Sequence, residues 1–192
     1  MTATKVDFLT PPEVVSVLCA LWADAGPRCV DLDPCSSPRS IVPARVAVLL
    51  PEAAAALEAS LEALAGAGVL VADGLALAWA PAARIFCNPP YAREFNQLWA
   101  DKVAAEGAAA RARGGELVAL VQSAPGSAYW ARYWEADALL WPRSRVRFLD
   151  AATGERLDRP SFDVALAYWG GRVEAFAAAG ATLGPTAAPV RS

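Results

Sequence analysis

The sequence predicts an α/β protein, built on a mostly parallel sheet with helices on both faces and an antiparallel hairpin at its C-terminal end. Two observations indicate this class. Short apolar runs alternate along the chain with segments of helical period, as in a sheet whose strands are joined by helices. Two further apolar runs near the C terminus flank a polar loop, which is typical of a hairpin.

The helical pattern is clearest near the N terminus. Thr10 is expected to cap a helix that has Pro11 at its first position and Glu13 at the capping-box position. Gly26 and Pro27 are expected to stop this helix. Its apolar stripe consists of Val14, Val17, Leu18 and Leu21.

The other expected elements follow in alternating order. Helices are expected at residues 51–65, along a stripe of Phe95, Leu98, Trp99 and Val103 that runs out to Arg113, around Trp130, Tyr133 and Trp134, and at 173–179. Strands are expected at residues 29–32, 69–72, 84–87, 116–121, 145–149 and 162–168, with a polar loop at 150–160. Aromatic residues at the spacing seen from Trp130 to Trp134 favour burial in a core over stacking on bases.

Three of the predicted strands end in a polar turn. Asp33 opens a turn of small residues after one strand, Asp73 and Gly74 follow another, and Asn88 follows the strand at 84–87. The carboxyl ends of parallel strands share one edge of a sheet, where open α/β sheets bind their ligands. We therefore expect Asp33, Asp73 and Asn88 to converge on one crevice, although each turn alone could simply reverse the chain.

Asn88, Pro89, Pro90 and Tyr91 form the motif with the clearest chemistry. Two successive prolines remove two backbone donors, so the strand cannot continue and the carbonyls of Asn88 and Pro89 are left without a neighbouring N–H. The Asn88 amide adds an acceptor and a donor, and Tyr91 adds a flat aromatic face. This set suits a planar amine; the alternative is an ordinary turn between strand and loop.

Length and composition exclude several classes of protein. The 192 residues suffice for one domain, expected over residues 1–180, with a disordered tail at 181–192. Histidine is absent and the four cysteines form no CxxC pair, so neither a metal site nor histidine acid–base chemistry is expected. The cysteines, two of them in predicted buried strands, favour a protein of the reducing cytosol. The sequence contains no membrane-spanning apolar run and no apolar signal core, so neither a membrane span nor secretion is expected.

The charge pattern bears on nucleic-acid binding. A net charge of −3 argues against a protein that holds nucleic acid by bulk electrostatics, but leaves room for local patches. Arg143, Arg145 and Arg147 alternate along one segment, which on a strand would place three guanidinium groups on one face. The same row could instead protect a solvated edge strand from aggregation.

Taken together, the motifs resemble a known family. In chain order they are FLTPPEVV, VDLDPCSS, DGLALAW, FCNPPY, ELVALVQSAP and RVRF, and they span residues 7–169. This combination is similar to the phage-type DNA N-6-adenine methyltransferases, which use S-adenosylmethionine. The resemblance implies a Rossmann-like methyltransferase fold. It implies that the protein acts in the cytoplasm of a bacterium or of a phage-infected host cell. It also implies methyl transfer to the N6 amine of an adenine flipped out of double-stranded DNA.

The resemblance implies roles for individual residues. The catalytic residues would be Asn88, Pro89, Pro90 and Tyr91, with the Tyr91 ring stacking on the flipped base. The cofactor-binding residues would be Thr10, Pro11, Asp31, Asp33, Pro34, Cys35, Ser36, Asp73 and Gly74. Candidate DNA contacts are Arg93, Arg143, Arg145, Arg147, Arg156 and Arg159. The chain departs from the family at residues 35–37, Cys-Ser-Ser, where many methyltransferases have glycines.

Two alternatives stay open. The acceptor could be another planar amine, such as cytosine N4, an RNA base or a protein glutamine amide, because an Asn-Pro-Pro-Tyr rim suits all of them. The chain could also be a binding protein on a catalytically silent methyltransferase scaffold. Binding of S-adenosylmethionine would separate that second alternative from an enzyme.

Overall fold

The computed structural model describes residues 8–158 and 162–189. These residues form a central sheet in the strand order β10-β7-β9-β6-β5-β2-β3-β4. Its strands are β2 (Val30–Asp33), β3 (Ala44–Leu49), β4 (Val69–Val71), β5 (Arg84–Cys87), β6 (Glu116–Gln122), β7 (Ala138–Leu140), β9 (Val164–Trp169) and β10 (Thr186–Ala187). A separate two-stranded ladder pairs β1 (Phe8–Leu9) with β8 (Leu149–Asp150).

Strand direction divides the sheet into two parts. The strands β4, β3, β2, β5 and β6 run parallel to one another. β9 is antiparallel to both β6 and β7, and β10 is antiparallel to β7. The predicted α/β class is therefore confirmed, with a mixed sheet, and the carboxyl ends of the five parallel strands lie at one edge.

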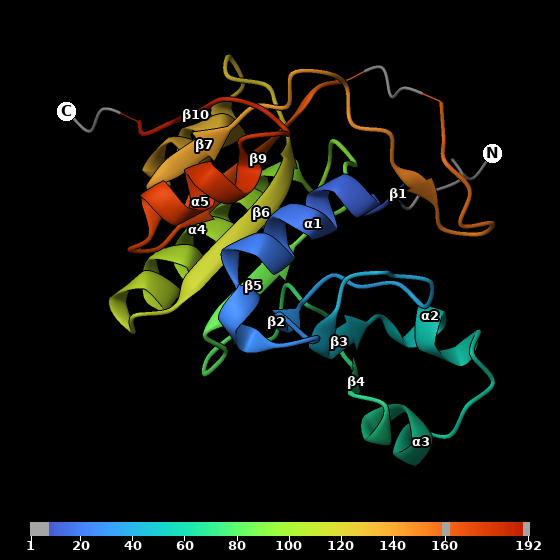
Figure 1. Ribbon diagram of the computed structural model, residues 1–192. Coiled ribbons are helices and arrows are strands. Elements are labelled where there is room, and N and C mark those ends of the chain that lie inside the picture. The colour runs from blue at the N-terminus through green and yellow to red at the C-terminus, as the bar shows by residue number, and fades with distance from the viewer. Residues whose placement is uncertain (1–7, 159–161, 190–192) are drawn as a thin grey trace.

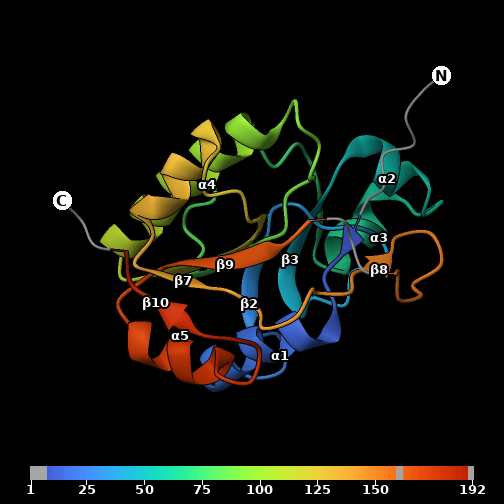
Figure 2. The ribbon, with the colours of Figure 1, turned by 90° about the horizontal axis from the view of Figure 1, so that it is seen from above.

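Helices cover both faces of the sheet (Figure 1). α1 (Pro12–Leu21) and α5 (Val173–Gly180) lie on one face, and α4 (Asn96–Ala112) lies on the other (Figure 2). The 3-10 helix η2 (Ala128–Glu135) packs against α4, and a shorter one, η1 (Ala23–Ala25), follows α1. Along β6, the side chains of Leu117, Ala119 and Val121 enter the core on the α4 side, whereas Val118 and Leu120 enter the core on the α1 side.

The start of α1 differs from the expectation. The predicted apolar stripe from Val14 to Leu21 is buried. The N-cap residue, however, is Pro11, and no side chain caps the helix. Thr10 lies one residue earlier. Its hydroxyl accepts a hydrogen bond from the Asn88 side chain and does not accept one from the first turn of the helix. The predicted Thr10 cap and capping box are therefore wrong.

The predicted helix at 51–65 is two short helices, α2 (Pro51–Ala55) and α3 (Leu61–Gly66). Between them, Glu58 has a φ of 52°, which a continuous helix cannot contain. Ser60 then caps α3 by accepting a hydrogen bond from the Ala63 N–H. Helix propensity of the alanine-rich segment was outweighed by this cap and by the small core of Leu49, Ala54 and Leu64 that the two helices form over the sheet.

The C-terminal hairpin has a different partner from the one expected. β9 pairs with β7, whereas the predicted strand at 145–149 forms only the short β8, which pairs with β1. Val146 and Phe148 are nevertheless buried, and Arg145 and Arg147 are exposed. The predicted alternation of buried and exposed side chains is therefore present, although residues 145–148 form no strand. The aromatic segment is a 3-10 helix, in which Trp130 and Tyr133 are buried but Trp134 is 42% exposed.

Four strands were not expected from the sequence: β1, β3, β7 and β10. β3 lies between β2 and β4 in the sheet, although residues 44–49 had been assigned no element. β10 lies in the segment expected to be a disordered tail, and it pairs with β7 at Leu139 and Leu140. The expectation of disorder is therefore wrong for Thr186 and Ala187.

Candidate functional site

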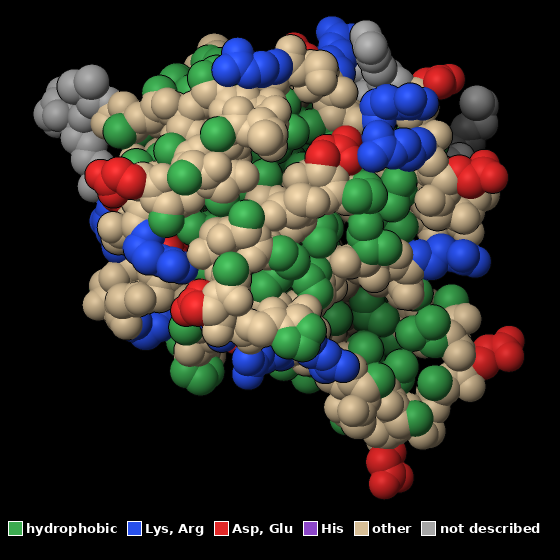
Figure 3. Space-filling model, in the orientation of Figure 1, with side chains coloured by type: hydrophobic (Ala, Val, Ile, Leu, Met, Phe, Trp, Pro, Cys, Tyr) green, Lys and Arg blue, Asp and Glu red, His purple; other side chains and the backbone are tan. Residues whose placement is uncertain are grey.

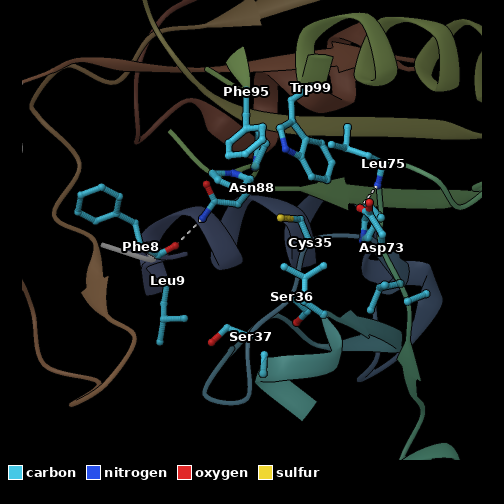
Figure 4. Close-up of a pocket in the computed structure, with 18 of the residues that line it drawn as sticks. Phe8, Leu9, Cys35, Ser36, Ser37, Asp73, Leu75, Asn88, Phe95 and Trp99 are labelled. Carbon is cyan, nitrogen blue, oxygen red and sulfur yellow. Dashed lines mark hydrogen bonds between the residues drawn. The ribbon is translucent and has the colours of Figure 1, made fainter. Parts of the chain in front are cut away.

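A pocket of about 270 Å³ opens at the carboxyl edge of the parallel strands. It is lined by the loops that follow β2, β4 and β5, together with the segment Phe8–Leu9, the segment after β3 and the start of α4 (Figure 4). The expected convergence of three polar turns is thus present. Of the predicted site residues, the pocket is lined by Pro34, Cys35, Ser36, Asp73, Gly74, Asn88, Pro89, Pro90 and Tyr91.

Asp33 lies beneath the pocket and does not line it. Its side chain is only 2% exposed, and its Oδ1 accepts a hydrogen bond from the Cys35 N–H at 3.2 Å. Burial raises the pKa of Asp33 to about 6, while hydrogen bonds with the Cys35 backbone and the Ser36 side chain limit the rise. Asp33 therefore shapes the loop that carries Cys35 and Ser36 and reaches a ligand only through that loop.

The turn after β4 contributes Asp73 and Gly74. Asp73 Oδ1 accepts a hydrogen bond from the Leu75 N–H at 2.9 Å, which closes a local turn and leaves its other oxygen for a ligand (Figure 4). A Cβ on Gly74 would lie 1.9 Å from the Pro34 carbonyl oxygen. Only glycine permits this contact, so Gly74 keeps the two loops of the pocket together.

The Asn88 side chain is held at both of its ends. Its Nδ2 donates to the Phe8 carbonyl at 3.0 Å and to Thr10 Oγ1 at 3.2 Å. Its Oδ1 accepts from the Tyr91 hydroxyl at 2.7 Å, and that hydroxyl also lies 3.0 Å from the Leu120 carbonyl. Burial raises the pKa of Tyr91 well above its ordinary value, so the hydroxyl stays protonated and remains a donor.

The Tyr91 ring belongs to an aromatic cluster. Its centroid lies 5.2 Å from that of Phe162, 5.6 Å from that of Phe148 and 6.0 Å from that of Phe8, in tilted or edge arrangements. Pairs at these distances stabilise each other. Tyr91 is also a lining residue of the pocket, so it belongs both to this cluster and to the site.

Asp31 does not belong to the pocket. Arg84 donates to its carboxylate from both its backbone N–H and its guanidinium, with the closest side-chain contact at 2.9 Å, and Arg45 lies at 3.4 Å. Burial alone would raise the pKa of Asp31, but the hydrogen bonds and charge of Arg84 hold it below its ordinary value. Arg84 begins β5 and Asn88 follows its end, so this ion pair lies away from the site. Asp31 therefore binds Arg84 and Arg45 and does not line the pocket, so its expected contact with a cofactor has no support in this geometry.

Several pocket residues were missed. Phe8 and Leu9 line the pocket, whereas the neighbouring Thr10 and Pro11 do not. Phe95 and Trp99 form an aromatic wall beside Asn88 and Cys35 (Figure 4). Both belong to the helical stripe expected from the sequence. Phe95 is 37% exposed, and an aromatic residue so soon after the motif is the signal that points to the site. Leu50 and Ala53 follow β3 and could not be found without that strand.

The candidate DNA contacts lie on the surface. Arg93, Arg143, Arg145, Arg147 and Arg156 are exposed, and Arg159 lies outside the described residues. Arg145 pairs with Asp163 at 3.1 Å, Arg156 pairs with Glu13 at 2.8 Å, and Arg147 donates to the Leu157 carbonyl. Figure 3 shows Lys and Arg side chains gathered around β1, with acidic side chains among them.

Among residues 8–158 and 162–189, no cluster of three or more Cys, Asp, Glu or His side chains is arranged to hold a metal ion. No helix in the described ranges combines the length and apolar character needed to cross a membrane.

Comparison with models of known protein families yields no match for this chain. A search of the curated proteins likewise finds no similar sequence. Functional assignment therefore depends on the motifs and on the geometry of the pocket.

Proposed function

We propose that the chain is a methyltransferase that uses S-adenosylmethionine and acts on a planar amine. One observation carries this proposal: the loops after β2 and β4 and the Asn-Pro-Pro-Tyr motif after β5 line one pocket. Ligand sites of open α/β sheets lie at this edge. Within that class, we propose the N6 amine of adenine in double-stranded DNA as the acceptor, because the motif combination resembles the DNA N-6-adenine methyltransferases.

The pocket combines apolar walls with oxygen atoms, which suits a ligand that carries both a flat ring and polar groups. Leu50, Ala53 and Trp99 supply apolar walls, and Ser36 and Asp73 supply oxygen atoms. In this proposal these residues hold the cofactor, and Gly74 keeps the two loops close enough to do so. S-adenosylmethionine, when bound, supplies a sulfonium methyl group that is already activated for transfer.

The acceptor end of the pocket is formed by Asn88 and Pro89. An exocyclic ring amine is a poor nucleophile, because its lone pair is delocalised into the ring. Hydrogen bonds from its protons to Asn88 Oδ1 and the Pro89 carbonyl would return electron density to the nitrogen and aim it at the methyl group. Burial raises the pKa of Tyr91 and keeps its hydroxyl protonated, so the motif positions the amine and takes no proton from it. As the new N–CH3 bond forms, the bond between the methyl group and sulfur would break, and the amine nitrogen would then release one proton to solvent.

An adenine inside a duplex cannot reach this pocket, so the base must be flipped out. Unstacking costs a few kcal/mol, and stacking on an aromatic ring returns about 1–3 kcal/mol. Tyr91 and Phe95 line the pocket, and both follow Asn88 closely along the chain. Both are candidates to hold the flipped base.

Methylated nucleosides in host DNA test this proposal. The chain and an Asn88→Ala variant would be expressed in a host that lacks its own adenine and cytosine methyltransferases, and the DNA digested and analysed by mass spectrometry. We expect N6-methyladenine with the unaltered chain only. N4-methylcytosine in its place would move the acceptor to cytosine, and unmodified DNA despite soluble protein would refute the proposed substrate.

A further inference from the structure

We infer that Thr10, together with the Phe8 carbonyl and the Tyr91 hydroxyl, fixes the Asn88 amide so that only its oxygen can meet a ligand. This inference rests on the proposed function, since it assigns a positioning role around the proposed acceptor site. It gives Thr10 a role other than contact with the cofactor. It also extends the site to the N-terminal segment, whose side chains and carbonyls would otherwise have no part in transfer.

The orientation of the amide follows from the Phe8 carbonyl. A carbonyl oxygen accepts hydrogen bonds and cannot donate them, so the Asn88 atom 3.0 Å from it must be the nitrogen. Rotating the amide by half a turn would place two acceptors against each other. The opposite end of the side chain, facing the Tyr91 hydroxyl at 2.7 Å, must then be the oxygen.

Both protons of the Asn88 nitrogen are used within the protein. One is donated to the Phe8 carbonyl and the other to Thr10 Oγ1 at 3.2 Å. The oxygen has two lone pairs, of which the Tyr91 hydroxyl occupies one. Toward a ligand, the amide is therefore an acceptor only. A ring amine satisfies it, whereas a ring carbonyl at the same place would set oxygen against oxygen.

The Tyr91 hydroxyl has one proton and two acceptors within reach. Asn88 Oδ1 lies at 2.7 Å and the Leu120 carbonyl at 3.0 Å, so the proton can turn from one to the other. When an amine donates to Asn88 Oδ1, the Tyr91 proton can bond Leu120 instead. Asn88 Oδ1 therefore has a hydrogen-bond donor in the absence of a ligand and can accept one from the amine of a bound ligand.

The N-terminal segment is anchored well enough to impose this orientation. Phe8 and Leu9 pair with Asp150 and Leu149 in the β1–β8 ladder. The Phe8 ring packs 5.1 Å from that of Phe148, centroid to centroid. Thr10 is 4% exposed, so water cannot readily replace its hydroxyl as the partner of Asn88.

The test compares Thr10→Val, which removes the acceptor, with Thr10→Ser, which keeps it. Thr186→Val is a matched control, because the buried Thr186 hydroxyl has no hydrogen-bond partner among the described residues. At saturating cofactor, Thr10→Val should lower kcat about ten-fold, the scale of one hydrogen bond, with unchanged affinity for S-adenosylmethionine. Thr10→Ser should restore most of the rate, and Thr186→Val should not alter it.

A second readout does not depend on activity. The Asn88 side-chain amide protons would be assigned in nitrogen-15 NMR spectra as the pair lost in Asn88→Ala. Both should exchange slowly with solvent in the unaltered chain and in Thr10→Ser, and one should exchange faster in Thr10→Val. If no form of the chain methylates DNA, the proposed function fails while amide exchange still decides this inference.

Two results would overturn the inference. The first is Asn88 amide exchange that is the same in Thr10→Val as in the unaltered chain. The second is a Thr10→Val variant whose affinity for S-adenosylmethionine falls about ten-fold while kcat at saturation is unchanged. Thr10 would then be a cofactor contact, as the family resemblance implies.

Discussion

Asp33 is a buried acid whose charge the protein must tolerate at neutral pH. Its folded pKa of about 6 lies above its ordinary value of 3.8, so Asp33 contributes stability that is full below about pH 4 and lost as the pH rises through 6. Asp33→Asn removes this dependence but keeps an oxygen for the Cys35 N–H.

We compare the free energy of unfolding of Asp33→Asn with that of the unaltered chain. From pH 4 to pH 8, we expect this difference to shift by about 3 kcal/mol in favour of Asp33→Asn. Urea unfolding at several pH values measures this difference. Asp24→Asn, on the exposed surface, is the control. If the difference in free energy of unfolding between Asp33→Asn and the unaltered chain does not vary with pH, the pKa of Asp33 is not raised by folding.

Residue-scale contacts also explain what sequence reasoning misjudged. Thr10 precedes two prolines and a glutamate, which favours a helix cap, yet its partner is Asn88, 78 residues away. Asp31 sits on a strand below the Asp33 turn, yet it is occupied by Arg84, 53 residues away. Local patterns cannot reveal such long-range partners. They did locate the turns that line the pocket, because that requires only the strand ends.

At the scale of elements, the pocket depends on contact between two loops. A Cβ on Gly74 would lie 1.9 Å from the Pro34 carbonyl oxygen and 3.3 Å from the Trp99 side chain. Backbone cannot yield as a flexible side chain does, so Gly74→Ala must push the loop after β4 away from the loop after β2.

We expect Gly74→Ala to lower the free energy of unfolding by about 1–3 kcal/mol, the usual cost of overpacking, and to weaken S-adenosylmethionine binding at least ten-fold. Thermal unfolding and calorimetric titration measure the two effects. Gly126→Ala is the matched control, because a Cβ there meets nothing within 4 Å. Equal cofactor affinity in both variants would contradict the proposed cofactor pocket.

The elements that sequence reasoning missed are those defined by pairing. β3 became visible only through its parallel ladders with β2 and β4, and the short β7 through its position beside β9. β10 has two residues and exists as a strand because it pairs with β7. Helices α1 and α5 have local apolar patterns. The expectation matched both ends of α5 and the start of α1 within one residue, but α1 ends at Leu21, before the expected stop at Gly26.

At the scale of the molecule, a net charge of −3 confines any DNA contact to local patches. The segment with Arg143, Arg145 and Arg147 follows β7, which runs parallel to β6, so it leaves the sheet at the edge that carries the pocket. The Trp141 indole donates to Ser123, just beyond the end of β6, which fixes the start of this segment at that edge.

We expect Arg143→Gln to weaken duplex binding about equally for all sequences and to reduce the slope of log affinity against log salt by about 1. Fluorescence anisotropy at several salt concentrations measures both. Arg113→Gln is the control, because Arg113 lies at the end of α4, next to the start of β6 and at the opposite edge. The same slope in both variants would remove Arg143 from the DNA surface.

The central claim is that Asn88 helps to pass a methyl group to adenine. The most direct test incubates purified protein with duplex DNA and S-adenosylmethionine labelled in its methyl group, then identifies the labelled nucleoside. We predict labelled N6-methyladenine with the unaltered chain and at least a hundred-fold less with Asn88→Ala, at similar cofactor affinity. Labelled N6-methyladenine at equal rates from both proteins, or bound cofactor with no label in DNA, would contradict the account.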